Sequence, residues 1–475
     1  MRRLRRGLAR ACAIVAGCAV VSGPTGGAVS RPNDPLYAGD GQWALQRVGF
    51  TPPGRGGSAW DAGTGDQPVV VAVLDTGLDY HHPDLAPESV WRNPGEQANG
   101  RDDDGNGYVD DLIGWNFVDG DNNPWDRAGH GTHVAGIIAA ATDNAEGIAG
   151  INPRVRIMPL KVMNFMGRGR SSGIAAAIYY AVGQGARLIN LSLGGEKLSR
   201  TERLAIDWAH ERGALVVVAA GNSGVDLRDF GPAGLTRALT VAATGRQDER
   251  TAFSNWGQAV DLAAPGVDVL SLRARRTDFL WVSGAADYVP GRAFVGEGAR
   301  YYRATGTSFA APFVTGVASL LLSRDPTLSN AQLERMLLMS SDDVEVPGWD
   351  QYTGVGRLNA LRALRADPDW FLLARLSGVN VARTEDGPAF EVCGSVEGSD
   401  APSWVIELGR GSEPDDWKAV GARHEGPAEA CPLGVVPLSA IGAPGTWTVR
   451  LRATDARGET REARGTIEIA RKGGA

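Results

Sequence analysis

The stretch VAVLDTGLD, residues 71–79, runs from apolar, β-branched residues directly into an aspartate, Asp75. Such a run predicts a strand buried on both faces, as in a parallel sheet. Strands of this type are predicted at Val69–Leu74, Leu188–Leu193, Ala214–Ala220, Ala238–Ala243 and Ala259–Ala263. Helices are predicted at His133–Ala141, Ser172–Gln184, Ser199–Arg212 and Phe309–Leu322. This alternation predicts an α/β fold, with a parallel sheet, helices on both faces, and Asp75 at a strand's carboxyl end, where such folds bind ligands.

Two further stretches supply reactive side chains. GHGTHVAG, residues 129–136, contains His130, and GTSFAAP, residues 306–312, contains Ser308. A serine hydroxyl is a weak nucleophile unless a base takes its proton and a carboxylate orients that base. The chain order Asp, His, Ser is that of subtilisin. From about residue 33 to about residue 364 the chain therefore resembles the subtilisin-like (subtilase) serine peptidases. The resemblance implies Ser308 as nucleophile, His130 as general base and Asp75 as its orienting group.

The same resemblance implies further site residues. Asn222, in AAGNSG, would donate to the developing oxyanion. The segment LSLGG, residues 191–195, would pair with the backbone of an extended peptide through Ser192, Leu193 and Gly194. Phe230 is predicted to narrow the primary specificity pocket. His133 is expected to be a packing residue, because HGTH lacks the spacing and the glutamate of a metalloprotease motif.

A first calcium site is implied by ATDNAEGIAG, residues 141–150, which has the spacing of the calcium loop in thermitase-like members of the family. Calcium takes six to eight oxygen ligands, and the resemblance supplies such a mixture. Side-chain oxygens are expected from Asp34, Asp84, Asn144 and Glu146. Carbonyl oxygens are expected from Ala141 and Ile148.

A second calcium site is predicted in DDDGNGYVDD, residues 102–111. Asp102, Asp104 and Asn106 occupy positions 1, 3 and 5 of an EF-hand loop, and the Tyr108 carbonyl falls at position 7. An isoleucine stands where that loop has its bidentate glutamate, so Asp110 or Asp111 is expected to substitute. The alternative is a solvated acidic turn without metal.

The N-terminal residues resemble a secretory leader. A basic segment, MRRLRRGLAR, precedes the apolar run ACAIVAGCAVV, so residues 1–30 are predicted to be a signal peptide. The alternative is a lipobox at residues 15–18, with Cys18 as a lipid anchor. Either one predicts a secreted or cell-envelope protein. Outside the leader only Cys393 and Cys431 remain, and in an exported protein they are predicted to form a disulfide. The net charge of −7 argues against a nucleic-acid partner.

The chain is long enough for two domains. We expect a peptidase domain at residues 31–366 and a β-sandwich domain at residues 367–475, the latter with a hairpin formed by Thr446–Thr454 and Gly465–Ile469. Residues 273–302 resemble an insertion that enters the site. The sequence thus predicts an exported, calcium-stabilised serine endopeptidase acting on polypeptides. That insertion and the few residues before Asn33 leave one alternative, an inactive peptidase-fold binding protein. A second alternative is a narrowly specific processing enzyme that docks its partner through the β-sandwich domain.

Overall fold

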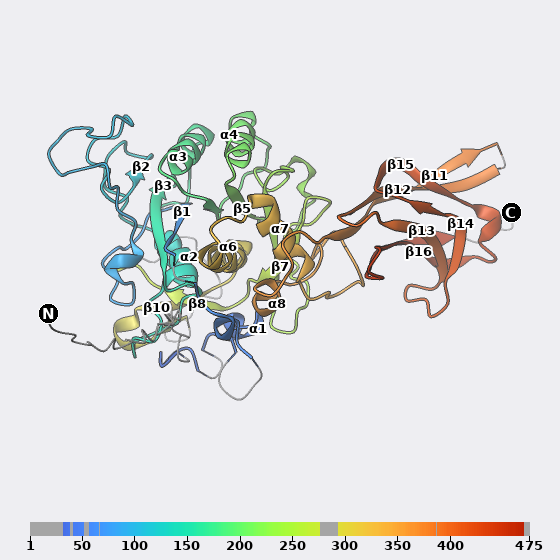
Figure 1. Cartoon of the computed structure of the whole chain (residues 1–475), viewed down its shortest axis with the longest axis horizontal. Coiled ribbons are helices and arrows are strands. Elements are labelled where there is room, and N and C mark those ends of the chain that lie inside the picture. The colour runs from blue at the N-terminus through green and yellow to red at the C-terminus, as the bar shows by residue number, and fades with distance from the viewer. Residues whose placement is uncertain are drawn as a thin grey trace, which may run out of the picture.

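The computed structural model describes residues 32–38, 41–51, 57–65, 67–275, 293–385 and 387–469. In Figure 1 an α/β part, which contains the first three quarters of the chain, lies beside an all-β part that ends at the C-terminus. The predicted leader, with Cys18, lies outside the described residues. Among the helices that the structure describes, none is both long and apolar enough to cross a membrane.

A seven-stranded sheet forms the centre of the α/β part, in the order β2-β3-β1-β4-β5-β6-β7. All neighbouring strands in it are parallel. The strands are β1 (Val69–Asp75), β2 (Trp115–Asn116), β3 (Val155–Lys161), β4 (Leu188–Leu191), β5 (Leu215–Ala219), β6 (Leu239–Thr244) and β7 (Leu262–Pro265). The predicted α/β class is confirmed, and β3 is a strand that the sequence analysis missed.

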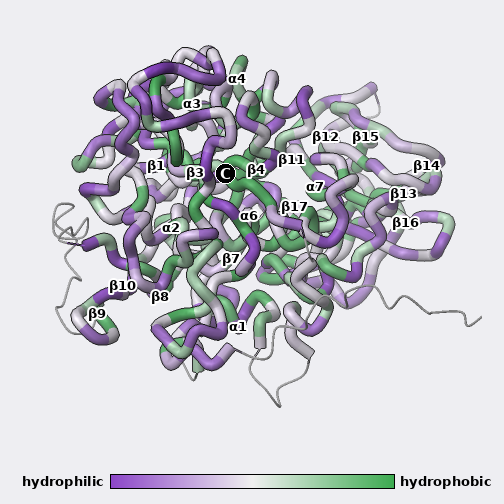
Figure 2. The backbone as a smooth tube through the Cα atoms, turned by 60° about the vertical axis from the view of Figure 1, so that its left-hand side comes forward, coloured by the Kyte–Doolittle hydropathy of each residue, from purple (hydrophilic) through white to green (hydrophobic). Residues whose placement is uncertain are grey.

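Helices cover both faces of this sheet, because the side chains of each strand alternate between two apolar clusters. Val71 and Val73 pack with α2 (His130–Ala139) and α6 (Thr307–Arg324) on one face. Ala72 and Leu74 pack with α3 (Ser171–Gly183) and α4 (Arg200–Glu211) on the other. Three more helices are α1 (Trp43–Arg47), α7 (Asn330–Met339) and α8 (Ala360–Ala363). Figure 2 shows the hydrophobic segments concentrated in the central strands and in α6.

The predicted insertion begins and ends in a small antiparallel sheet of order β8-β10-β9. Its strands are β8 (Val269–Leu272), β9 (Phe294–Val295) and β10 (Tyr301–Ala304). The two ends of the insertion are therefore joined by hydrogen bonds, with Tyr301 opposite Leu272. Residues 276–292 of the predicted insertion lie outside the described residues.

Two antiparallel sheets make up the all-β part, and they share one apolar core, as in a sandwich. One sheet contains β11 (Leu372–Thr384), β12 (Gly387–Gly398) and β15 (Ala428–Pro437). The other contains β14 (Lys418–Glu425), β13 (Ser403–Arg410), β16 (Gly445–Thr454) and β17 (Thr460–Ile469). The predicted hairpin is confirmed as β16 and β17, although β17 begins five residues before the predicted Gly465.

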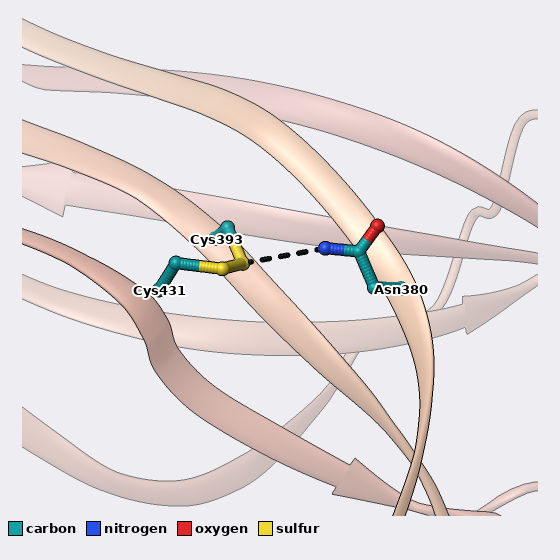
Figure 3. The surroundings of a disulfide bond; sticks show 3 residues. All are labelled: Asn380, Cys393 and Cys431. Carbon is teal, nitrogen blue, oxygen red and sulfur yellow. Dashed lines mark hydrogen bonds between the residues drawn. A yellow bond between two sulfur atoms is a disulfide. The ribbon is translucent and has the colours of Figure 1, made fainter.

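A disulfide joins Cys393 on β12 to Cys431 on β15, 38 positions apart (Figure 3). The Asn380 amide on β11 donates to the Cys393 sulfur at 3.5 Å. The bond thus lies within one sheet of the sandwich, as the cysteine pairing predicted.

The segment between α8 and β11 is held against both parts of the molecule. Arg324 donates to the Leu364 carbonyl at 2.6 Å, and Gln332 donates to the Asp369 carboxylate at 2.9 Å. The Trp370 indole donates to Asp455 of the sandwich at 2.8 Å. The backbone of Trp349 also donates to the Glu462 carbonyl on β17. The two parts are therefore in direct contact, and the boundary at residue 366 stays a prediction.

Candidate active site

Asp75 and His130 come together because α2 begins directly against the end of β1. Asp75 is the last residue of β1 and is fully buried, and His130 is the first residue of α2. The imidazole Nδ1 lies 2.8 Å from Asp75 Oδ1 and 3.0 Å from Oδ2. A Cβ at Gly131 would lie 2.2 Å from the Gly77 carbonyl oxygen, so only glycine permits this approach.

Ser308 lies in the first turn of α6, where one backbone hydrogen bond of the helix is absent and a side chain replaces it. Pro312 has no N–H to donate to the Ser308 carbonyl four residues earlier. The hydroxyl of Ser192, just after β4, donates to that carbonyl at 2.7 Å instead. In return, the Ser308 hydroxyl donates to the Ser192 carbonyl at 3.3 Å. The ring of Phe309, the next residue, lies 5.3 Å from the His130 ring, so the start of α6 packs against His130.

Asn222 lies after β5 and is oriented by Thr307, the residue before Ser308. The Thr307 backbone N–H and hydroxyl donate to Asn222 Oδ1 at 2.8 and 2.9 Å. The Thr307 hydroxyl also accepts from the Gly221 N–H at 2.9 Å. With its oxygen engaged in this way, Asn222 presents its Nδ2 group as the hydrogen-bond donor. The structure therefore places an amide donor beside the start of α6.

The pKa values of the two histidines of α2 shift in opposite directions because their partners differ. Burial disfavours the charged form of His130, but the Asp75 carboxylate outweighs it and holds the pKa above its ordinary value. Burial and the neighbouring His130 lower the pKa of His133 to about 3. The His133 ring packs on Tyr302 and Phe309 with centroids 4.5 and 4.4 Å apart. His133 is thus a neutral packing residue, as predicted.

The predicted peptide-binding segment is exposed where a substrate backbone would pair. Ser192 is buried, Leu193 is half-buried and Gly194 is exposed. The Phe230 ring fills the space between this segment and Gly221, because a Cβ at Gly194 would lie 2.8 Å from the ring and one at Gly221 2.7 Å from it. The ring is 9% exposed, so it can form the wall of a pocket there. The narrowing of the primary pocket stays a prediction.

The first calcium loop wraps around two buried carboxylates, Asp34 and Asp84. Asp34 accepts from the N–H groups of Asp143 and Asn144, and Asp84 accepts from the Asn144 amide and the Ile148 N–H. Burial raises the pKa of both carboxyls, that of Asp84 to about 7. Neither has a Lys or Arg partner in the part of the chain that the structure describes. Two buried carboxylates without a cation fit a calcium site.

Two features of this loop differ from the expectation. The Glu146 carboxylate pairs with Arg300 at 2.5 Å, because the chain that enters β10 passes beside the loop. The buried Tyr301 hydroxyl lies beside the Asp84 carboxylate, and both groups are next to Gly147. Ala141 remains next to the site through its N–H, which donates to the Asp84 carbonyl. The residues present therefore still fit calcium, without the Glu146 side chain.

The second loop gathers a carboxylate that its spacing did not reveal. Glu96, Asp102 and Asp104 bring one oxygen each within 4.8 Å of one another. Asp110 instead accepts from the N–H groups of Asn99 and Gly100, which places its carboxylate elsewhere. Asp111 is buried and accepts from the Tyr180 hydroxyl. Asn106 donates its amide to Asp104 and Asp111, and the Tyr108 ring packs on Trp115, Phe117 and Tyr180.

The geometry is that of a serine peptidase with an Asp–His pair, a serine at a helix N-terminus and an amide donor beside it. Residues 66–356 match the subtilase family. A thermophilic serine proteinase from Bacillus sp. (strain AK1) is 37% identical over 333 residues, covering 70% of this chain and 69% of that relative. Thermitase from Thermoactinomyces vulgaris is 34% identical, covering 70% of this chain and 99% of that relative.

Solved structures agree with these sequence relatives. A protease from Pseudoalteromonas arctica has 29% sequence identity and a TM-score of 0.55, covering 71% of this chain and 99% of that one. The chain belongs to the subtilase family and is a serine endopeptidase, whose substrates are polypeptides.

Proposed function

We propose that this protein is an exported, calcium-stabilised serine endopeptidase with the triad Asp75, His130 and Ser308. The observation that carries the proposal is the 2.8 Å contact between His130 Nδ1 and Asp75, which assigns the proton of the neutral ring to Nδ1. Nε2 is then the basic nitrogen. It takes the Ser308 proton as Oγ attacks the scissile carbonyl, and it passes that proton to the leaving amine. Water then hydrolyses the acyl-enzyme by the same route.

Asn222 is proposed as the side-chain donor to the oxyanion. Its carbonyl oxygen is engaged by Thr307, so its Nδ2 group is preoriented rather than free to rotate. A donor fixed before the reaction stabilises the developing charge without reorganisation. Ser192, Leu193 and Gly194 are proposed to pair with the substrate backbone, which brings the scissile carbonyl to Ser308.

Calcium is proposed to stabilise the fold rather than to take part in the reaction. At the first site it would be held by Asp34, Asp84, Asn144 and the carbonyls of Ala141 and Ile148. At the second site it would be held by Asp102 and Asp104 with Glu96, and by the oxygens of Asn106 and Tyr108. A bound cation would offset the repulsion among carboxylates that the fold forces together.

Export is proposed from the leader-like residues 1–30 and from the disulfide in the all-β part. The cell envelope or the extracellular medium would then be the site of action. The intact mass of the mature protein distinguishes a cleaved signal peptide from a lipid anchor, because cleavage near residue 31 and acylation at Cys18 give different masses. The all-β part is proposed as a separate domain from about residue 367.

A fluorophosphonate probe tests the proposed activity. The probe should label wild-type protein and not Ser308→Ala, and the variant should lose peptide hydrolysis while its circular dichroism stays unchanged. A wild-type protein that neither reacts nor hydrolyses peptides would support the inactive binding protein instead. Cleavage of very few sequences in a peptide library would support the narrow processing enzyme.

A further inference from the structure

A small pocket lies beside the peptide-binding segment and contains none of the catalytic residues. Leu193, Gly194 and Gly195 line it, so a peptide paired with this segment would lie next to the pocket. Its volume is about 150 Å³. Sites for whole small molecules are several times larger, so this pocket is of a size for one side chain.

The lining of the pocket includes a buried carboxylate that the proposed mechanism does not use. Glu202 lies in the first turn of α4, lines the pocket and is only 6% exposed. Burial raises its pKa, and the Ser171 hydroxyl is the partner that opposes this rise. No Lys or Arg forms an ion pair with Glu202 among the residues that the structure describes. A buried carboxyl group without a basic partner favours a ligand that brings a positive charge.

The walls are apolar, and the one cation in the lining lies at the surface. Met163 and Ile174 are 8% and 6% exposed and line the same pocket. Lys197 also lines it, but its side chain is exposed and does not pair with Glu202. A ligand for this pocket therefore needs an apolar stem and a positive end.

We propose that Glu202 is a specificity-determining residue that selects a lysine or arginine side chain of the bound polypeptide. The methylene stem of that side chain packs on Met163 and Ile174, and its cation pairs with the Glu202 carboxylate. The substrate thus supplies the positive charge that no described Lys or Arg of the chain provides to Glu202. This inference rests on the proposed function, because it requires a peptide paired along residues 192–194.

The test uses peptide substrates that differ at one position at a time on either side of the scissile bond. With wild-type protein, kcat/KM should be at least about tenfold higher for Lys or Arg than for Met at one fixed position, since a charge-assisted bond contributes at least that much. In Glu202→Gln this ratio should fall close to one. In Glu202→Leu it should reverse in favour of Met. The circular dichroism spectra of all three proteins should coincide, which shows that the variants are folded.

Glu196→Gln is the matched control, because Glu196 is an exposed carboxylate in the same loop that does not line the pocket. It should keep the wild-type ratio. If Glu196→Gln and Glu202→Gln lowered the ratio equally, the preference would come from the overall negative charge of the surface, and the proposal would be wrong. A preference for Lys or Arg that survives in Glu202→Gln would also overturn it. Peptides cleaved without any basic preference would overturn this inference alone. No cleavage of any peptide would instead overturn the proposed function.

Discussion

Removal of calcium should lower the melting temperature, and the structure indicates which site contributes most. Asp34 and Asp84 are 2% and 0% exposed, and both lack a basic partner among the described residues. A cation that binds only the folded state at 100 times its Kd stabilises it by about 2.7 kcal/mol. At about 2–4 °C per kcal/mol for a domain of this kind, one site corresponds to about 5–10 °C.

The assay is differential scanning calorimetry of the Ser308→Ala variant, which prevents self-digestion, in excess calcium and in excess chelator. Asp84→Asn should remove most of the calcium-dependent shift that belongs to the buried loop. Asp102→Asn should remove the smaller shift that belongs to the more exposed loop, where bound cation competes with water. Identical melting curves with and without chelator, after incubation long enough for exchange, would refute the reasoning for both sites. A shift that survives in both variants would place the metal elsewhere.

The other predictions concern the oxyanion donor, the base and the disulfide. Asn222→Ala should lower kcat by about 10²–10³-fold with little change in KM, because the donor acts in the transition state; a change in KM alone would indicate a binding role. The base must be neutral to accept a proton, and Asp75 outweighs burial in raising the pKa of His130, so kcat/KM should rise with pH through a midpoint above about 6.5. Asp75→Asn should move that midpoint to lower pH, and an unmoved midpoint would mean that another group titrates. Closing a 38-residue loop between Cys393 and Cys431 should stabilise the sandwich by about 4 kcal/mol. Reduction should therefore unfold the sandwich first and spare much of the activity, whereas two free thiols in non-reducing peptide maps would contradict the bond.

None of the strands that the sequence predicted contains a proline, and β3 shows why one was missed. Pro159 interrupts its run, and proline cannot donate to a neighbouring strand. The structure tolerates it because β2 is only two residues long and pairs with Leu160 and Lys161, beyond the proline. The outer side of β3 is therefore without a partner strand at Pro159. Whether a strand can contain a proline depends on which segments pair with it. The spacing of residues along one segment does not show that pairing.

The residues of the candidate site also fall into two groups, those that a local motif identifies and those that depend on a distant partner. Asp75, His130, Ser308 and Asn222 each lie within an extended motif, so their surroundings could be recognised locally. Glu96 and Glu202 could not be recognised in this way, because each acquires its role from a fold-dependent neighbour: Glu96 from a loop six residues later, and Glu202 from the segment after β4. For Glu146, the Arg300 partner lies 154 positions away. A local spacing rule contains no information on such partners.

The short connection before β11 has a consequence for how long the intact protein persists in its own presence. A peptidase binds its substrate as an extended strand of several residues, so a folded chain must first open locally to be cut. Links between two folded parts are ordinarily the first places to be nicked. Here Leu364, Asp369 and Trp370 are each tied by a hydrogen bond to a different element. Autolysis should therefore begin at loops of the two parts, and the all-β part should remain attached to the peptidase throughout the protein's working life.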